Sequence, residues 1–249
     1  MNPSAALLYG KGIFTTIAIR DRQPLLWDKH WRRIYDNAKI VGIELSAYSH
    51  RETLDQLTKS LQNEGIVNGR ARLTFFDESP SPIWPSDSPS KTSLHIITGN
   101  LRPVPDGFRL TVSPYPVNSR SPLAGVKSCN YLENLLAIEE AKTRGFQEAV
   151  RVNEHGFITG GCMSNVFWLK DEVLYTPKLA TGCLPGTTRE FVLENLECRE
   201  SEVRIEELSK ADAIFLTSAG LGITQVAEYE GKPMQRSGHP ILKLLATTI

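Results

Sequence analysis

The residue of this sequence with the clearest chemical potential is Lys127, in the run A-G-V-K-S-C-N-Y. It lies where an apolar, strand-like segment ends and a helical segment begins. A lysine amine that loses its water at such a junction has a lowered pKa, so it can act as a nucleophile and form a Schiff base with a carbonyl compound. Taken alone, the same residue is also compatible with an ordinary solvated side chain.

Two further segments carry groups that bind anions. Residues 184–190 read L-P-G-T-T-R-E, in which a glycine precedes a helix and Thr187 with Glu190 fits a capping box. Such a helix start offers backbone N–H groups and a positive dipole end to a phosphate, although a well-made helix start needs no ligand. Residues 217–224 read T-S-A-G-L-G-I-T, and small residues there let the backbone approach a ligand closely. This glycine-rich turn fits no dinucleotide-binding fingerprint.

Helices are predicted on both sides of these segments. Apolar residues recur at helical spacing after Asp28, which can cap the helix, and Gly42 can end it. A helix is also predicted from Tyr131 to Arg144, directly after Lys127. Its residues expected to face inward are Leu132, Leu135, Leu136, Ile138 and Ala141. Further helices are predicted over 51–64 and 188–196 and from residue 240 onward.

The strand-like runs between the helices predict a mixed α/β fold in two domains. They cover 12–19, 71–76, 93–98, 109–113, 149–152, 157–159, 166–169, 173–175 and 213–217. Residues 77–91 are rich in proline and serine and are expected to form a long exposed loop. The predicted organisation is a smaller N-terminal α/β domain over 1–117, a linker over 118–124 and a C-terminal α/β domain over 125–249.

Composition excludes several classes of protein. The 249 residues carry 28 Lys+Arg and 28 Asp+Glu, so the net charge is 28 − 28 = 0, which gives no electrostatic basis for binding nucleic acid. No apolar run is long enough to span a membrane, and the start of the chain lacks the features of a signal peptide. The four cysteines show neither C-x-x-C pairs nor zinc-ligand spacing, so we expect free thiols, no metal and a cytoplasmic location.

Together the three segments resemble the class IV aminotransferase family, the fold type IV enzymes that use pyridoxal 5'-phosphate (PLP). The resemblance spans nearly the whole chain. It is densest between residues 127 and 190, where K-S-C-N-Y-L, V-R-V-N-E-H-G-F-I-T, S-N-V-F-W and G-T-T-R-E follow the family's order and spacing. It implies PLP as the cofactor, a C-terminal domain that anchors it, a small-molecule substrate and a homodimer.

The resemblance also assigns site residues. Lys127 matches the catalytic lysine that binds PLP covalently, and Arg33, in H-W-R-R-I, matches the arginine that contacts the cofactor phosphate. The other cofactor-binding residues that it implies are Tyr131, Asn165, Gly186, Thr187, Thr188, Ser218, Ala219 and Gly220. Thr16 and Arg72 are expected to contact the substrate.

Local motifs then favour one activity within the family. The run G-K-G-I-F-T-T over 10–16 resembles the G-D-G-x-F-T-T of aminodeoxychorismate lyases, and so does F-W-L-K followed by L-Y-T-P. The implied reaction is elimination of pyruvate from 4-amino-4-deoxychorismate to give 4-aminobenzoate for folate synthesis. In that reaction the released Lys127 amine removes the C4 proton. The alternative is an aminotransferase of the branched-chain or D-amino-acid type that acts on a 2-keto acid.

The sequence departs from the family in the run I-T-G-G over 158–161. Most members have V-T-E-G there, and their glutamate bonds the pyridine nitrogen of PLP, whereas Gly160 has no carboxylate. A carboxylate keeps the ring protonated and electron-accepting, so its loss should harm reversible amino transfer more than an elimination that produces an aromatic ring. A third hypothesis follows, a non-catalytic protein that retains the PLP fold. The run F-F-D over 75–77, where many relatives have arginine and glycine, weakens the D-amino-acid alternative.

Overall fold

The computed structural model describes residues 3–81, 90–101 and 103–247, with side chains up to residue 245. The chain forms two compact units, which are described separately below. Unit 1 comprises 1–102 and 126–131, and unit 2 comprises 103–125 and 132–249. Of the loop predicted over 77–91, residues 82–89 lie outside the described part.

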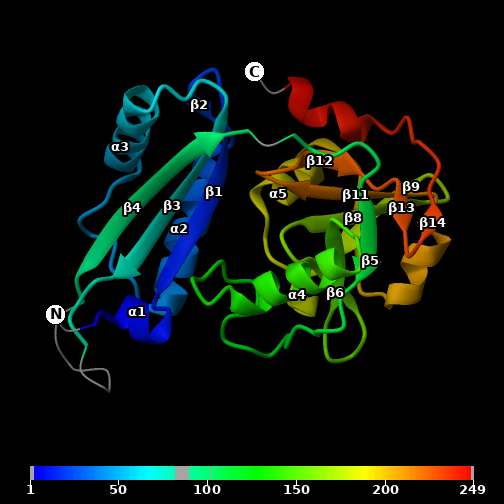
Figure 1. Cartoon of the computed structure of the whole chain (residues 1–249), viewed down its shortest axis with the longest axis horizontal. Helices are drawn as coiled ribbons and strands as arrows, with labels where there is room; N and C mark the ends of the chain where they lie inside the picture. The colour runs from blue at the N-terminus through cyan, green and yellow to red at the C-terminus, as the bar shows by residue number, and fades with distance from the viewer. Residues whose placement is uncertain (1–2, 82–89, 102, 248–249) are drawn as a thin grey trace. The chain divides into compact units, whose positions relative to one another are not determined.

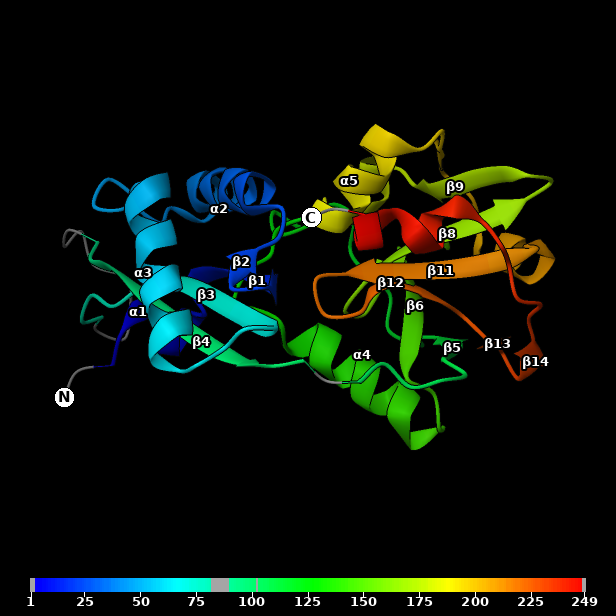
Figure 2. The ribbon, with the colours of Figure 1, turned by 90° about the horizontal axis from the view of Figure 1, so that it is seen from above.

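Unit 1 is built on an antiparallel sheet with the strand order β2-β1-β3-β4. Two long neighbours, β1 (Gly12–Arg20) and β3 (Gly69–Asp77), form its centre, with β4 (Thr92–Asn100) and the short β2 (Gln23–Pro24) outside them. The short helix α1 (Ala5–Tyr9) precedes β1, while α2 (Trp27–Val41) and α3 (His50–Asn63) lie on one face of the sheet (Figures 1 and 2).

The two long helices of unit 1 lie close to their predicted positions, but their N-termini differ from expectation. Helix α2 ends at Gly42 in the left-handed conformation, as predicted, whereas Leu26 rather than Asp28 occupies the N-cap. Helix α3 begins with a capping box between Ser49 and Glu52.

The core of unit 1 explains why these helices cover only one sheet face. Alternate residues of β1, such as Ile13 and Ile17, pack with Leu73 of β3 and with Ile34 and Leu57 from the two helices. The residues between them in β1, including Phe14 and Thr16, therefore point to the opposite face.

The segment that contains Lys127 belongs to unit 1 although it lies far along the chain. It runs beside the start of β1, where Phe14 N donates to Lys127 O over 2.9 Å and Cys129 N donates to Gly12 O over 2.8 Å. Backbone hydrogen bonding thus fixes Lys127 beside Phe14.

Unit 2 contains two five-stranded sheets, with the orders β14-β13-β5-β6-β7 and β10-β9-β8-β11-β12. The first is formed by β5 (Arg109–Val112), β6 (Glu148–Val152), β7 (Ile158–Gly161), β13 (Glu228–Tyr229) and β14 (Lys232–Pro233). The second is formed by β8 (Asn165–Lys170), β9 (Val173–Pro177), β10 (Arg199–Ser201), β11 (Ala213–Ser218) and β12 (Gly222–Gln225). The helices of the unit are α4 (Leu132–Thr143), α5 (Thr187–Asn195) and the 3-10 turns η1 (Leu179–Thr181), η2 (Ile205–Lys210) and η3 (Pro240–Thr247).

The sheets and helices of unit 2 pack together through three apolar clusters. Residues of the two sheets, among them Leu110, Val150 and Ile214, share one cluster, so these faces pack together. A second cluster joins the β8–β11 sheet to α5 and η3. In the third, Ala137 and Ala141 of α4 pack with Ala149 and Cys162, so α4 covers the β6–β7 sheet.

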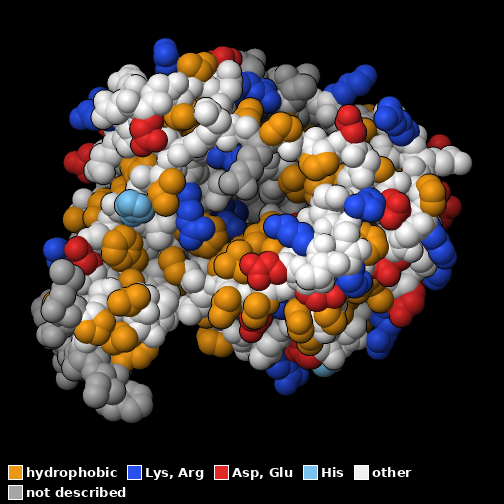
Figure 3. Space-filling model, viewed as in Figure 1, with side chains coloured by type: hydrophobic (Ala, Val, Ile, Leu, Met, Phe, Trp, Pro, Cys, Tyr) orange, Lys and Arg blue, Asp and Glu red, His pale blue; other side chains and the backbone are white. Residues whose placement is uncertain are grey.

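Helix α4 corrects the prediction for its leucines. Its buried residues are the alanines, while Leu132, Leu135 and Leu136 are 66%, 44% and 48% exposed. The small alanines allow the helix to approach the sheet closely, and the leucines therefore lie on the outer face. Figure 3 shows hydrophobic side chains at the surface over α4.

The boundary between the units differs from the predicted linker at 118–124. Strand β5 was assigned to the N-terminal domain, but it pairs in parallel with β6 and β13 and so belongs to unit 2. Residues 126–131 were assigned to the C-terminal domain, yet their hydrogen bonds go to β1. In both segments the unit is determined by pairing with residues far along the chain, which local composition cannot predict. In the described part of the chain, no helix has the length and hydropathy needed to cross a membrane.

Candidate active site

Lys127 lies among aromatic side chains of unit 1. Its Nζ donates to Tyr131 Oη over 3.2 Å and lies 4.5 Å and 4.7 Å from the ring centroids of Phe14 and Tyr131. The two rings meet edge to face, with centroids 5.0 Å apart. The amine is thus held by one hydroxyl and two π faces.

The charges around Lys127 favour its neutral form. Burial, and after it the positive charges of Arg33 and Arg72, lowers the pKa of Lys127 to about 7. A fraction of the amine is therefore unprotonated near neutral pH and can attack a carbonyl carbon. The same cluster of cations attracts an anion.

Arg33 is held in place by a chain of buried polar groups. Its Nη2 donates to Thr15 Oγ1 over 2.8 Å, and Thr15 Oγ1 lies 2.6 Å from Nδ1 of His30. Burial, with the charges of Arg33 and Lys127, lowers the pKa of His30 well below its ordinary value, so the imidazole is neutral. Because Thr15 accepts from Arg33, its own hydrogen is available for Nδ1 of that imidazole.

The predicted substrate contacts Thr16 and Arg72 are direct cross-strand partners in β1 and β3. Their side chains share the sheet face that carries Phe14. The Arg72 guanidinium carbon lies 3.6 Å from the centroid of the Phe14 ring, and Nε donates to Thr74 Oγ1 over 3.2 Å. The structure therefore brings Lys127, Arg33, Thr16 and Arg72 to the same part of unit 1.

In unit 2, helix α5 begins without a side-chain cap. Gly186 is the N-cap and makes no side-chain cap, so the predicted capping box of Thr187 and Glu190 is wrong: Thr187 is already the first helical residue. The N–H groups of a first helical turn lack partners within the helix and suit an oxyanion, but here that of Gly186 donates to Leu184 O over 2.8 Å.

Asn165 shapes the turn before this helix. Its Nδ2 donates to Leu184 O over 2.8 Å, and its Oδ1 would lie 1.9 Å from any Cβ at position 186. Glycine at position 186 is therefore required by the packing of Asn165. The predicted cofactor residue Asn165 acts on the backbone of this turn in the structure.

The second predicted anion-binding segment follows β11. Ser218 Oγ accepts from the backbone N–H groups of Gly220 and Leu221 over 3.2 Å and 3.1 Å, which closes the turn over Ser218, Ala219 and Gly220. The hydroxyl thereby fixes the loop that the sequence assigned to phosphate binding.

Glu148 is a buried carboxylate on β6, the strand that pairs with the strand of Gly160. Burial raises the pKa of this carboxylate. It accepts from the backbone N–H groups of Ala149, Cys162 and Met163 over 2.9–3.1 Å and from the Ser164 hydroxyl over 3.3 Å. Its oxygens hold the turn between β7 and β8.

Sequence reasoning missed several residues that shape the site. Phe14, Thr15 and His30 all contact predicted site residues. A signal existed for His30, because its three-residue spacing from Arg33 places both on one face of a helix.

Comparison with known proteins identifies the family. The profile described as Amino-transferase class IV matches residues 12–229, which is most of the chain. The chain belongs to the class IV aminotransferase family. This confirms the resemblance drawn from the motifs, and the mixed α/β fold is that of the fold type IV PLP enzymes.

Within the class IV aminotransferase family, relatives of two activities are similar to this chain. The aminodeoxychorismate lyase of Bacillus subtilis is 30% identical over 232 residues, covering 90% of this chain and 79% of its own. The branched-chain-amino-acid aminotransferase of Escherichia coli K12 is 27% identical over 248 residues, covering 92% and 79%. The branched-chain aminotransferase of Thermoproteus uzoniensis, solved with norvaline, matches at a TM-score of 0.89 and 26% identity, covering 98% and 86%.

PLP is an aldehyde and a phosphate ester, and unit 1 has groups that suit both: an amine with a pKa of about 7 and the Arg33 guanidinium. Considered by itself, unit 2 has a helix start at α5 without a side-chain cap, preceded by a glycine that admits no Cβ. An amine of this kind reacts with aldehydes, and the other groups bind phosphate.

The lowered pKa of Lys127 predicts its reactivity. Labelling of Lys127 by a small aldehyde without phosphate, trapped with cyanoborohydride and measured by mass spectrometry, should rise with a midpoint near pH 7, because only the neutral amine attacks. Replacing the neighbouring cation in Arg72→Met should move this midpoint upward, while Arg204→Met, an exposed arginine of unit 2, should leave it unchanged. A wild-type midpoint near the ordinary value of 10.5 would contradict the account.

The hydrogen bonds among Thr15, His30 and Arg33 predict that removing the Thr15 hydroxyl destabilises the protein. Thr15→Val should lower the free energy of unfolding by about 1–3 kcal/mol, because a buried guanidinium loses an acceptor. Urea denaturation measures the change. Thr16→Val, on the opposite face of the same strand, is the matched control, and equal losses in both variants would show that these hydrogen bonds have no special role.

Proposed function

We propose that this protein is a PLP-dependent 4-amino-4-deoxychorismate lyase that releases pyruvate and 4-aminobenzoate for folate synthesis in the cytoplasm. The observation that carries the proposal is the Lys127 amine, with a pKa of about 7, beside Arg33 and Arg72. The 30% identity to the Bacillus subtilis aminodeoxychorismate lyase supports it.

The lyase-like run over 10–16 contacts the segment that contains Lys127. Asn130 Nδ2 donates to Gly10 O over 3.2 Å, and a Cβ at position 10 would lie 2.5 Å from Asn130 Oδ1. A Cβ on Gly12 would lie 2.9 Å from Cys129 Sγ. The lyase-like G-K-G run and the K-S-C-N run around Lys127 therefore depend on one another.

The chain's own residues then have distinct roles. Lys127 would hold PLP, and its neutral amine would accept the proton from C4 of the substrate. Tyr131 Oη positions that amine. The resemblance assigns phosphate binding to Arg33 in unit 1 and, in unit 2, to Gly186, Thr187, Thr188 and the turn over Ser218, Ala219 and Gly220. Asn165 shapes the turn before α5. When bound, PLP supplies an electron-accepting ring that lowers the barrier to proton removal.

Arg72 and Thr16 suit the anionic substrate. 4-Amino-4-deoxychorismate carries two carboxylates, and a guanidinium is the side chain that best matches a carboxylate. Arg72 lies against Phe14, whose ring also contacts Lys127. A carboxylate bound by Arg72 would therefore be near the amine that takes the proton.

An aminotransferase acting on branched-chain substrates is the second candidate function. The 27% identity to the Escherichia coli enzyme and the fold match to the Thermoproteus uzoniensis enzyme favour it. Gly160 counts against it, because reversible amino transfer depends most on a protonated ring. The third hypothesis, a non-catalytic PLP-binding protein, rests on the same glycine.

A homodimer is part of the proposal. Leu132, Leu135 and Leu136 form an exposed apolar row on α4, at the spacing that places them on one helix face. A second copy of the chain covering this row would remove apolar surface from water.

The deciding experiment supplies the purified protein with PLP and 4-amino-4-deoxychorismate. Both pyruvate and 4-aminobenzoate should form in equal amounts, and Lys127→Ala should reduce both to background. Lys178→Ala, an exposed lysine, serves as the control and should retain the activity. Amino transfer to a 2-keto acid without pyruvate release would establish the second candidate, and PLP binding with neither reaction would establish the third.

A further inference from the structure

The side chain across the strand pair from Gly160 is that of Arg151. In the antiparallel pairing of β6 with β7, Arg151 and Gly160 are direct partners, next to an irregularity of register at Arg151 and Val152. Cross-strand partners place their side chains on the same face. This is the face on which Ala149 and Cys162 pack against α4. Gly160 has no side chain on that face, where a Cβ would lie 3.2 Å from Ser164 O, and its cross-strand neighbour is an arginine.

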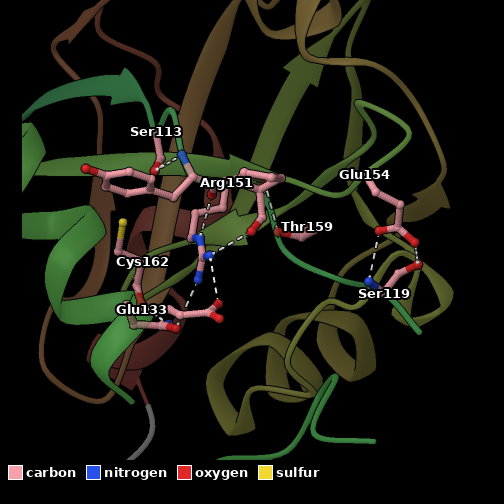
Figure 4. Close-up of polar contacts among 10 residues, drawn as sticks. Ser113, Ser119, Glu133, Arg151, Glu154, Thr159 and Cys162 are labelled. Carbon is pink, nitrogen blue, oxygen red and sulfur yellow. Dashed lines mark hydrogen bonds and ion pairs between the residues drawn. The ribbon is translucent and has the colours of Figure 1, made fainter. Parts of the chain in front are cut away.

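The guanidinium of Arg151 is buried and held by groups at the start of α4. Arg151 is 3% exposed, and Nε and Nη2 donate to the backbone oxygens of Tyr115 and Pro116 over 3.2 Å and 3.0 Å. Nη1 donates to Asn134 Oδ1 over 3.1 Å, and Nη2 reaches Glu133 over 3.3 Å. Figure 4 shows the side chain extending toward Glu133, with the Thr159 hydroxyl bonded to the Arg151 backbone.

The guanidinium of Arg151 has one more N–H group than these contacts use. A guanidinium has five N–H groups and cannot accept a hydrogen bond. The four contacts above use one from Nε, two from Nη2 and one from Nη1, so within the described part of the chain one N–H on Nη1 is not used. The carboxylate that faces Arg151 belongs to Glu133, whose side chain is 78% exposed, so the positive charge of Arg151 is only weakly offset.

Glu148 does not restore the acid that Gly160 lacks. Along β6, Glu148 and Val150 share one face, while Ala149 and Arg151 share the other. Glu148 therefore points away from the face of Arg151, and its oxygens hold the backbone of the turn after β7.

We infer that Arg151 is the positioning residue that faces the pyridine nitrogen of PLP and donates a hydrogen bond to it, so that the nitrogen stays unprotonated. The inference rests on the proposed function, since it takes position 160 to face that nitrogen. An unprotonated nitrogen accepts from a guanidinium, whereas a pyridinium would be repelled by its charge. In this contact the protein donates the hydrogen bond and the ring nitrogen accepts it, whereas with a carboxylate the protonated ring nitrogen donates.

This assignment narrows the chemistry that the site supports. A ring without the extra proton withdraws electrons less strongly, which disfavours reversible amino transfer. Elimination that yields an aromatic product has a strong driving force of its own and tolerates the weaker ring. Arg151 thereby selects for the lyase reaction over amino transfer.

The test uses PLP labelled with ¹⁵N in the ring and bound to the full-length protein, observed by NMR between pH 6 and 9. The wild-type resonance should stay at the position of an unprotonated pyridine over the whole range. In Arg151→Met the resonance should move toward the pyridinium position as the pH falls, while Arg204→Met should behave as the wild type. A pyridinium resonance in the wild-type protein, or a wild-type spectrum in Arg151→Met, would overturn the inference.

A second measurement needs no variant, in case Arg151→Met does not fold. 1-Deaza-PLP, which has C–H in place of the ring nitrogen, should bind the wild-type protein about tenfold or more weakly than PLP, because it cannot accept from Arg151. Equal affinities would overturn the inference. Failure of the wild-type protein to bind PLP at all would instead refute the proposed function, so the two failures are distinct.

Discussion

The interaction on which this structure depends is the repulsion among Lys127, Arg33 and Arg72. These side chains are gathered around Phe14 and Tyr131, and burial together with two guanidinium groups lowers the pKa of the lysine to about 7. Holding such a cluster lowers the stability of the folded state. Between pH 7 and 10.5 the unfolded chain binds more protons at this lysine than the folded chain, so the free energy of unfolding rises with pH through that window. An anion that carries an aldehyde group would offset this loss of stability, because its negative charge would balance the guanidinium groups and its aldehyde would react with the neutral amine.

The first strand of unit 1 bears most of this arrangement. One face of β1 sends Thr15 to His30 and Arg33 on α2, and the other sends Phe14 to Lys127 and Arg72. The backbone of the same strand bonds the segment that contains Lys127. A single strand thus sets the spacing of a nucleophile and two cations that are distant in the sequence. In unit 2 the corresponding features are three turns, each held by one side chain. These side chains are Asn165 before α5, Ser218 after β11 and Glu148 after β7.

Much of this was predictable from the sequence, and the remainder has physical reasons. Strand alternation and helix periodicity predicted β1, β3, α2 and α3, and the motif around Lys127 predicted the family, because these signals are local. The parallel pairing of β5 with β6 and the return of residues 126–131 to β1 were missed, since they depend on partners far along the chain. The leucines of α4 were expected inside, but periodicity cannot tell which face meets the sheet when alanines compete for it. The buried contacts of Arg151 were missed because its acceptors Tyr115, Pro116 and Asn134 are distant in the sequence.

The central claim is that Lys127, and no other lysine, is the amine that this fold prepares for an aldehyde. Reduction of the PLP-loaded protein with borohydride followed by peptide mapping tests it most directly, because reduction makes the bond between lysine and cofactor permanent. The account predicts one phosphopyridoxyl group per chain, on the peptide that contains Lys127. A label on another lysine, or none under conditions in which PLP is retained, would contradict it.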